Sequence, residues 1–296
     1  MSWKGLVIEK PARLSLRLGQ LLLDKEDAQY SIPLEDLSFI VFDSKQVSVT
    51  TALLSACAES GCLVLTTNAR HLPNGMLQSF PSHHRQLETI ELQMSASEPC
   101  KKRLWQTLIQ CKIANQAECL RALRLPGENK VAYFCKRVRS GDPENVEGQA
   151  ARAYWGLMEG NFRRDSEGSD KLNALLNYGY ALVRSALAQR LAAHGFVPAM
   201  GLHHCNRHNP FNLADDLIEP WRPFVDYRAV SRWRISKEDE LSTEDRRQML
   251  EIFYDQVYWK DCVQTILSAL NPYVEQLREC MNEPHKKFIC PMFQRS

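Results

Sequence analysis

The sequence lacks closely spaced cysteine pairs, although it is not poor in cysteine. Ten cysteines are scattered along the 296 residues, and the two nearest in sequence, Cys57 and Cys62, are separated by four residues. Structural zinc sites of the ribbon and knuckle types need tighter pairs, so no such site is expected. Without a secretory signal, scattered cysteines are expected to be reduced thiols that fill core positions.

The chain also lacks a long apolar run. No segment approaches the roughly 20 consecutive apolar residues that a membrane-spanning helix requires. Lys4 and Glu9 interrupt the N-terminal stretch and leave no apolar segment of the length that a secretory signal contains. These absences predict a cytoplasmic protein that does not associate with a membrane.

A strong excess of charge is missing as well, since the formal net charge is only +2. This balance neither requires nor excludes binding to nucleic acid, so the positions of the basic residues matter more than their number. Taken alone, a basic cluster is more often a solvated face than a binding site. The basic residues gather beside Lys136 at Arg137 and Arg139, at Arg163 and Arg164, and along Arg222, Arg228, Arg232 and Arg234.

Residues 1–84 have the pattern of a small β domain. Apolar and polar residues alternate from 12 to 18, and residues 37–42 are rich in β-branched and aromatic side chains, which suits strands. Residues 49–59 have helical spacing and are followed by Gly61, a natural helix-ending residue. Several short strands with turns between them favour a sandwich-like sheet. The remaining strands are expected at residues 6–8, 21–23, 31–34, 62–67 and about 76–80.

From residue 85 onward the pattern becomes helical. Apolar residues recur at spacings of three and four as far as Leu123. Asp142 and Pro143 have the character of a capped helix start, and that helix is expected to run to about residue 160. The predicted fold is α+β, with a β-sandwich-like domain over residues 1–84 and a larger all-α domain over 85–296. Further helices are expected at about 169–191, 243–258 and 262–281.

A carboxylate interrupts an otherwise apolar helix face in the second domain. If a helix begins near Pro143, Glu147 shares a stripe with Ala151, Tyr154 and Met158. A carboxylate on such a stripe is costly unless it is paired, hydrogen-bonded or bound to a cation. The alternative is that Glu147 occupies the first turn, where the helix dipole favours a negative charge in any case.

Two adjacent histidines are expected on a loop. His203 and His204 follow Gly201 and a turn, which would display them. Neutral histidine is a common metal ligand, but paired histidines are more often merely polar. The nearby Cys205 and His208 do not provide the additional ligands at fixed offsets that a zinc site needs.

Asp216 and Glu219 are three residues apart, so a helix would place both carboxylates on one face. Like charges repel, and this face therefore needs a cation. Arg222 is one candidate, which would make the group an ordinary surface cluster. A metal ion is the other, because Glu219 together with Glu147 and His204 would form a mostly oxygen ligand set that suits Mg²⁺ or Mn²⁺.

Four segments of the second domain resemble the motifs of a known family, in that family's order. On these motifs the chain resembles the CRISPR-associated spacer-acquisition integrase family, and more narrowly the branch found with type II systems. The resemblance covers the whole chain, and the motifs together are far more specific than any one of them. The segments are Val146–Arg152 with E-G-x-x-A-R, Asn173–Ala181 with N-x-x-L-N-Y-G-Y, Gly201–His204, and Asp216–Asp226 with D-L-x-E-x-x-R-P.

The resemblance implies roles for residues of these motifs. Glu147, His204 and Glu219 are expected to hold one divalent metal ion, Mg²⁺ or Mn²⁺, and His204 is favoured over His203. Asp216 matches a second acidic position and is expected to orient His204 or a metal-bound water. Outside these motifs, the basic residues Arg137, Arg139, Arg163 and Arg164 are expected to contact the DNA backbone without distinguishing bases.

The resemblance also implies a function and partners. The family activity would make the protein a metal-dependent DNA integrase and endonuclease of CRISPR adaptation, in which the 3′-OH of a short captured DNA attacks a phosphodiester at the border of a repeat. A homodimer through the β domain is implied, with two dimers bridged by a small ferredoxin-like partner in a heterohexamer. In type II systems the RNA-guided effector nuclease contributes to the choice of captured DNA. A stand-alone structure-specific nuclease and a non-catalytic scaffold that binds DNA ends remain the alternatives.

Overall fold

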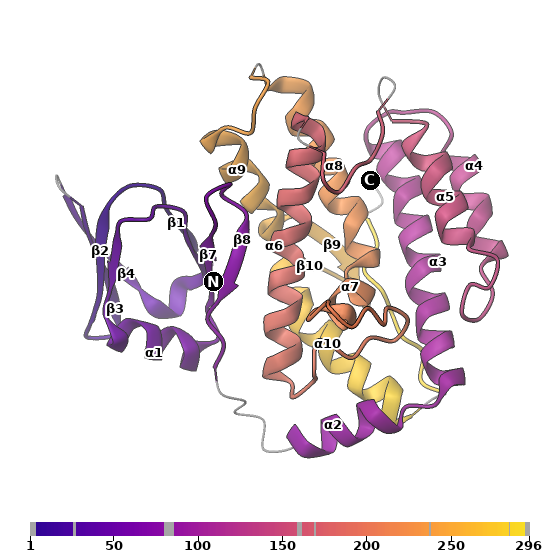
Figure 1. Cartoon of the computed structure of the whole chain (residues 1–296), viewed down its shortest axis with the longest axis horizontal. Coiled ribbons are helices and arrows are strands. Elements are labelled where there is room, and N and C mark those ends of the chain that lie inside the picture. The colour runs from indigo at the N-terminus through magenta and orange to yellow at the C-terminus, as the bar shows by residue number, and fades with distance from the viewer. Residues whose placement is uncertain are drawn as a thin grey trace. The chain divides into compact units, whose positions relative to one another are not determined.

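The structure is a computed structural model that describes residues 4–25, 28–79, 86–158, 162–168, 170–236, 238–283 and 285–293. The chain divides into two compact units, residues 1–82 and 83–296 (Figure 1). The first holds strands β1–β8 with one α-helix, and the second is mainly helical, which confirms the expected α+β class. No helix in the described part of the chain is long and apolar enough to cross a membrane.

The first unit is built from two four-stranded sheets. One has the order β1-β5-β7-β8, in which β1 and β7 run parallel to β5 and β8 runs antiparallel to β7. The other has the order β4-β3-β2-β6, in which β6 runs parallel to β2 and the other pairs are antiparallel. The elements are β1 (Lys4–Ile8), β2 (Ala12–Arg17), β3 (Gln20–Lys25), β4 (Ala28–Pro33), the short 3-10 helix η1 (Leu34–Asp36), β5 (Leu37–Phe42), β6 (Val47–Val49), α1 (Thr51–Ser60), β7 (Leu63–Thr67) and β8 (Pro73–Met76).

One hydrophobic core serves both sheets and α1. It contains Leu14 of β2, Leu21 of β3, Ile40 of β5 and Leu53 of α1, each at most 1% exposed. Gly61 ends α1 in the left-handed conformation, with φ 71°, as its position predicts. The parallel pairing of β1, β5 and β7 differs from the antiparallel pairing typical of sandwiches, and the sandwich-like detail of the expectation is not confirmed.

The second unit packs its helices around α6, which is buried along most of its length. α6 contacts α7, α8, α9 and α10, while α3 contacts α4, α5, α8 and the 3-10 helix η3. Gly179 permits a close approach, because a Cβ there would lie 2.5 Å from Val225 Cγ1 of α8 and 2.6 Å from Met249 Cε of α9. The elements are α2 (Gln86–Ser95), α3 (Glu98–Ala122), α4 (Glu128–Ala132), η2 (Tyr133–Arg137), α5 (Val146–Trp155), α6 (Lys171–Ala193), α7 (Asn212–Leu217), η3 (Glu219–Trp221), α8 (Arg222–Ile235), α9 (Thr243–Leu250), η4 (Glu251–Tyr254), β9 (Gln256–Trp259), β10 (Cys262–Thr265) and α10 (Ile266–Asn282).

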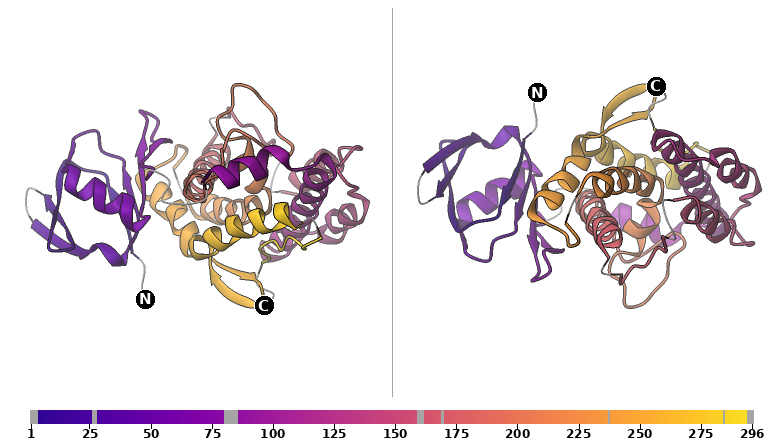
Figure 2. Two further views of the ribbon diagram at one scale, coloured as in Figure 1. Left: turned by 90° about the horizontal axis from the view of Figure 1, so that it is seen from below. Right: turned by 90° about the horizontal axis from the view of Figure 1, so that it is seen from above.

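A β-hairpin among the helices corrects the expectation of an all-α second domain. The sequence predicts helices over 243–258 and 262–281, but residues 256–265 contain the antiparallel strands β9 and β10 (Figure 2). Val257 and Trp259 are buried and alternate with exposed residues. This period-two pattern is too short to stand out beside the helical spacing on both sides of it.

The helix that carries Glu147 is shorter than predicted. α5 spans Val146–Trp155 rather than 143–160, and residues 159–160 lie outside the described residues. Asp142 nevertheless caps this helix, because its carboxylate accepts hydrogen bonds from Val146 N at 2.8 Å and Glu147 N at 2.9 Å. The cap therefore acts from a turn that precedes the helix rather than from its first residue.

A buried carboxylate ties three helices of the second unit together. Asp245 of α9 is fully buried, with Oδ2 2.8 Å from Lys171 Nζ of α6 and Oδ1 accepting a 2.6 Å hydrogen bond from Arg232 Nε of α8. Ser242 N donates to the same carboxylate at 3.0 Å. Burial by itself raises the pKa of Asp245, but these donors outweigh burial and hold the pKa well below its ordinary value.

We expect Asp245→Asn to lower the free energy of unfolding by about 3 kcal/mol at neutral pH, because it leaves the buried ammonium of Lys171 without a carboxylate. Urea denaturation followed by far-UV circular dichroism measures this decrease. Since the folded pKa is lowered, this stabilisation is present above the unfolded pKa of about 3.9 and shrinks as the pH falls below it.

The matched control for this prediction is Glu244→Gln, which removes an exposed ion pair with Arg247. Its expected effect is below about 1 kcal/mol, because both partners remain in water. Equal destabilisation of the two variants would show that the buried network does not stabilise the helical unit.

Candidate metal centre

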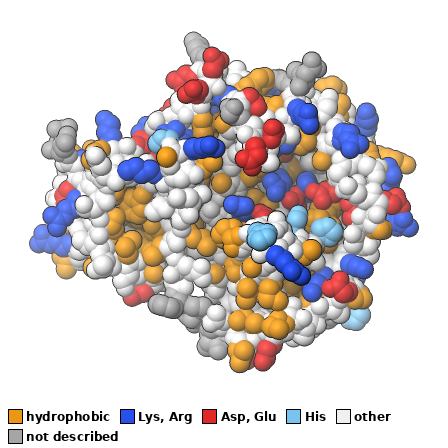
Figure 3. All heavy atoms as spheres, in the orientation of Figure 1, with side chains coloured by type: hydrophobic (Ala, Val, Ile, Leu, Met, Phe, Trp, Pro, Cys, Tyr) orange, Lys and Arg blue, Asp and Glu red, His pale blue; other side chains and the backbone are white. Residues whose placement is uncertain are grey.

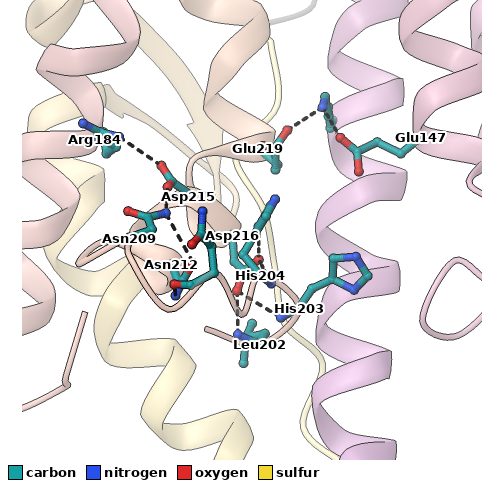
Figure 4. A network of polar contacts seen from close by, with 12 residues as sticks. Glu147, Arg184, Leu202, His203, His204, Asn209, Asn212, Asp215, Asp216 and Glu219 are labelled. Carbon is teal, nitrogen blue, oxygen red and sulfur yellow. Dashed lines mark hydrogen bonds and ion pairs between the residues drawn. The ribbon is translucent and has the colours of Figure 1, made fainter. Parts of the chain in front are cut away.

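A pocket of about 300 Å³ in the second unit brings the three candidate ligands together. Glu147 reaches it from α5, His204 from the loop after α6, and Glu219 from η3 (Figure 4). Histidine, acidic and basic side chains gather on the face of the molecule that Figure 3 displays. His203 is not among the residues that line this pocket, whereas Lys112 of α3 is.

Glu147 lies in the first turn of α5 and also faces the pocket. Asn145 precedes the helix with a positive φ of 49°, and its side chain accepts a hydrogen bond from Gly148 N. Together with the Asp142 cap, this arrangement fixes the direction in which α5 starts. The two interpretations of Glu147 are therefore compatible, because first-turn placement and a position on the pocket wall occur at once.

Asp216 holds the loop that carries His204. Its carboxylate is fully buried and accepts backbone hydrogen bonds from Leu202 N at 2.5 Å, His203 N at 3.1 Å and His204 N at 3.1 Å. Gly201 is required in this turn, because a Cβ there would lie 2.3 Å from the carbonyl oxygen of His204 and 2.7 Å from Asp216 Oδ2. The turn is thus folded around one carboxylate.

The same carboxylate fixes the imidazole of His204. His204 Nδ1 lies 2.6 Å from Asp216 Oδ1 and donates to it, since an ionised carboxylate can only accept. This hydrogen bond raises the pKa of His204. In the neutral ring Nε2 is then the nitrogen with a free lone pair, which is the tautomer that a metal ligand needs.

The two neighbouring histidines contact Trp105 of α3 in different ways. The His203 ring stacks on Trp105 with centroids 4.2 Å apart and an interplanar angle of 3°. The His204 ring meets the same indole edge-on at 5.6 Å and 89°. His203 is therefore engaged with an aromatic face, while His204 extends along the indole edge to the pocket.

Glu219 is a buried carboxylate compensated by two cations. It is 3% exposed, and Oε1 accepts a 2.8 Å hydrogen bond from Arg222 Nε while Oε2 lies 2.5 Å from Lys112 Nζ. Burial raises the pKa of Glu219, but the charges of Arg222 and Lys112 outweigh it and lower the pKa to about 2. The Asp216–Glu219–Arg222 surface cluster considered from sequence forms only in part. Arg222 pairs with Glu219, but both carboxylates are buried and Asp216 turns to the His204 loop.

Lys112 is the residue of this pocket that sequence reasoning missed. Its ammonium lies 2.6 Å from Glu147 Oε1 and 2.5 Å from Glu219 Oε2, and its side chain is only 10% exposed. The available signal was its spacing from Trp105, Leu108 and Ile109, which places a lysine on the buried face of α3. A buried lysine in such a stripe indicates a partner of negative charge.

The donor set fits a hard divalent cation, although the described side chains as placed do not yet enclose one. In the part of the chain that the structure describes, no three His, Cys, Asp or Glu side chains are gathered closely enough to hold an ion. The ammonium of Lys112 instead lies between Glu147 and Glu219. Two carboxylates that face one positive charge, with an oriented imidazole beside them, are suitable ligands for Mg²⁺ or Mn²⁺.

The N-x-x-L-N-Y-G-Y segment of α6 contributes Tyr180 to the pocket and holds Arg164 beside it. Asn173 Oδ1 and Asn177 Oδ1 accept hydrogen bonds from Arg164 at 2.9 Å and 2.6 Å, which aims this arginine at the pocket. Tyr180 donates to the buried Asp226, and the guanidinium of Arg164 lies 5.3 Å from the Tyr180 ring centroid. The motif thus positions a cation beside the candidate ligands.

The other arginines expected to bind DNA lie in different surroundings. Arg137 and Arg139 both pair with Glu144, Arg137 at 3.9 Å. The Arg139 side chain remains 67% exposed, and Arg163 is exposed as well. Of the four, Arg164 lines the pocket. Contact with DNA remains a prediction for all four residues.

A family model and curated relatives of one protein family match this chain. The family model described as "CRISPR associated protein Cas1" matches residues 6–252. The "CRISPR-associated endonuclease Cas1" of Neisseria meningitidis serogroup C (strain 8013) is 35% identical over 296 residues, covering 97% of this chain and 95% of its own. The "CRISPR-associated endonuclease Cas1 2" of Pyrobaculum aerophilum is 25% identical and covers 73% of this chain and 77% of its own.

Solved structures share the fold at lower identity. A casposase bound to integration product has a TM-score of 0.79 at 17% identity and covers 96% of this chain and 92% of its own. A Cas6-RT-Cas1–Cas2 complex has a TM-score of 0.70 at 20% identity and covers 100% of this chain and 36% of that one. A Cas1 protein from Thermotoga maritima has a TM-score of 0.68 at 15% identity, with 99% and 100% covered.

We expect Asp216→Asn to loosen the loop that presents His204, because an amide group cannot accept all four of the hydrogen bonds that this carboxylate accepts. Hydrogen bonds to a charged group contribute about 1.5–3 kcal/mol each, so exchange of the amide hydrogens in residues 201–208 should accelerate by about tenfold or more. Hydrogen–deuterium exchange with mass spectrometry measures this directly.

Asp215→Asn is the matched control, because Asp215 is the adjacent acid but contacts Asn209 and Arg184 instead of the loop amides. Its exchange rates in residues 201–208 should remain within about twofold of those of the unaltered chain. Equal acceleration in both variants would mean that Asp216 is not what holds the turn.

Proposed function

This chain belongs to the Cas1 family of CRISPR-associated proteins, and we propose that it is a metal-dependent DNA integrase of CRISPR adaptation that also has endonuclease activity. The observation that carries the proposal is the convergence of Glu147, His204 and Glu219 on one pocket. Two carboxylates and an oriented imidazole are a ligand set for Mg²⁺ or Mn²⁺, and such ions suit reactions at phosphodiesters.

The proposed reaction is a transesterification. The 3′-OH of a captured DNA attacks the phosphorus at the border of a repeat, a new P–O bond forms, and the bond to the former 3′ oxygen breaks. The proton of the attacking hydroxyl is released and the departing 3′ oxygen takes one up, so no covalent protein intermediate is needed. A bound divalent ion would supply positive charge at the scissile phosphate and lower the cost of the alkoxide.

The chain's own side chains prepare the pocket for this chemistry. Glu147 and Glu219 supply carboxylate oxygens, and Asp216 holds the His204 ring in the tautomer that leaves Nε2 free. Arg164, held by two asparagines, is placed to neutralise a phosphate oxygen of bound DNA. Hydrogen bonds and ion pairs hold these groups before substrate arrives, which lowers the reorganisation needed during the reaction.

The proposed partners are DNA, a second copy of this chain and a small ferredoxin-like CRISPR-associated protein. Two structural neighbours, a casposase bound to integration product and a Cas6-RT-Cas1–Cas2 complex, support DNA and a CRISPR-associated partner protein. We propose a homodimer through residues 1–84, with two dimers bridged by the small partner in a heterohexamer.

A stand-alone structure-specific nuclease is the second candidate, because the same three ligands would serve water as the attacking group equally well. The test incubates the protein and its small partner with a labelled 3′-OH duplex and a supercoiled repeat plasmid in Mn²⁺ or Mg²⁺. Label joined to the plasmid supports the integrase. Nicked plasmid without label favours the nuclease, and DNA binding without either product favours a scaffold.

We expect Glu147→Gln, His204→Ala and Glu219→Gln each to lower the rate of strand transfer by about a hundredfold or more. Each substitution removes a proposed ligand of the metal ion whose charge would stabilise the transferring phosphate. DNA binding should change by only a few-fold, since affinity comes mainly from backbone contacts elsewhere. Single-turnover joining assays and filter binding separate the two effects.

His203→Ala provides the matched control, because His203 neighbours His204 in sequence but stacks on Trp105 outside the pocket. This variant should retain strand-transfer activity within about tenfold, because it removes no proposed ligand of the metal ion. Full activity in His204→Ala, or a larger drop in activity in His203→Ala than in His204→Ala, would overturn the assignment of the ligand.

We expect the double variant Arg137→Gln/Arg139→Gln to weaken binding to all duplex sequences alike, if both residues bind phosphates. The slope of log affinity against log salt should then become shallower by about one unit for each arginine that no longer binds a phosphate. Arg247→Gln is the control, because Arg247 also forms an exposed ion pair with a neighbouring acid. An unchanged slope in the double variant would show that these arginines are solvated surface residues that do not bind phosphates.

A further inference from the structure

Lys112 occupies the place that a cation takes between the two candidate carboxylate ligands. Its Nζ lies 2.6 Å from Glu147 Oε1 and 2.5 Å from Glu219 Oε2, while its stem rises from the buried face of α3. The residue as a whole is 8% exposed. A lysine this deeply buried, with a carboxylate on each side, belongs to the pocket rather than to the surface.

The buried carboxylate of Glu219 needs a positive charge whether or not a metal is bound. Glu219 is 3% exposed, and a buried carboxylate without a counter-charge is strongly disfavoured. Arg222 compensates Oε1, but Oε2 lies buried against Lys112. Glu147 faces the same ammonium from α5, so Lys112 also joins two helices across the pocket.

A divalent ion and the ammonium cannot share these oxygens. Both would sit within a few ångströms of each other, and like charges at that distance repel, most strongly beside the buried Glu219. The ammonium nitrogen of Lys112 also takes up the space between the two carboxylates. A metal ion bound by both carboxylates would need that space. Metal binding therefore requires the ammonium to withdraw.

We propose that Lys112 is a built-in counter-ion that holds Glu147 and Glu219 before the metal arrives, and that it leaves them for Gln116 when a divalent cation binds. The inference rests on the proposed function, because it takes the same carboxylates to be metal ligands. It adds a residue that competes with the metal, sets the metal's apparent affinity and keeps the empty ligand pair in place.

Gln116 is the structure's own acceptor for the displaced ammonium. It lies four residues further along α3, on the same helix face, and lines the same pocket. It is 2% exposed, and among the described residues its buried Oε1 has no hydrogen-bond partner. An orphaned buried acceptor is costly, so an ammonium that moves one helical turn satisfies it while clearing the carboxylates.

The experiment measures Mn²⁺ binding to the metal-free full-length protein by isothermal titration calorimetry. We expect Lys112→Met to tighten the dissociation constant for Mn²⁺ by tenfold or more, because the competing cation is gone. The melting temperature of the same variant should fall in EDTA and rise further on addition of Mn²⁺ than that of the unaltered chain. Unchanged or weaker Mn²⁺ binding in Lys112→Met would overturn the proposal.

Gln116→Leu tests the destination of the ammonium and does not depend on the folding of Lys112→Met. Among the described residues Oε1 makes no hydrogen bond that the substitution would remove, so the variant should fold. We expect it to weaken Mn²⁺ binding several-fold, because the displaced ammonium then has no acceptor. Mn²⁺ affinity equal to that of the unaltered chain would contradict the exchange.

Two further variants separate this inference from the proposed function. Lys101→Met is the matched control, since Lys101 lies on α3 but pairs with the exposed Glu98, and its Mn²⁺ affinity should not change. Glu219→Gln should abolish Mn²⁺ binding. If the unaltered chain binds no Mn²⁺, the metal centre itself is wrong. If Glu219→Gln abolishes binding but Lys112→Met leaves it unchanged, only the role of Lys112 fails.

Discussion

The burial of negative charge is the constraint on which the helical unit depends. Asp216, Glu219 and Asp226 are each at most 3% exposed, and all lie on one stretch of chain that runs through α7, η3 and α8. None can be buried without donors, so the surrounding helices and loops are arranged to supply them. The candidate metal centre is lined by Glu219, by Asp226 and by His204, which Asp216 holds.

Each of the three carboxylates is compensated by a different chemistry, and the consequences differ. Asp216 takes backbone amides and an imidazole, which folds a loop around it. Glu219 takes two cations, and its pKa is lowered to about 2 although burial raises it. Asp226 takes the hydroxyl groups of Tyr154 and Tyr180, which are too weak to offset burial, so its pKa is raised to about 6. The carboxylate that is paired directly with two cations therefore stays ionised, whereas the pKa of the one that accepts from hydroxyl groups is raised.

The sequence predicted the parts of the structure that local pattern controls. The strands around residues 12–18 and 37–42, the helix that ends at Gly61, and the α+β class follow from period, turn residues and capping. The β9–β10 hairpin was missed because four-residue strands carry almost no periodicity of their own. The parallel pairing in the first unit was missed because pairing direction depends on connections between distant segments rather than on the strands themselves.

The residues of the candidate site also differ in how far the sequence could predict them. Motif resemblance singled out Glu147, His204 and Glu219, and the structure lines one pocket with them, but their role as ligands stays a prediction. Lys112 was missed, since the carboxylates that it pairs with are 35 and 107 residues away along the chain. Sequence spacing reveals a partner only within one helix or hairpin, whereas this ammonium is held between α5 and η3. A charged residue on a buried helix stripe is thus the signal to seek, because the cost of its burial guarantees a partner that the local sequence does not contain.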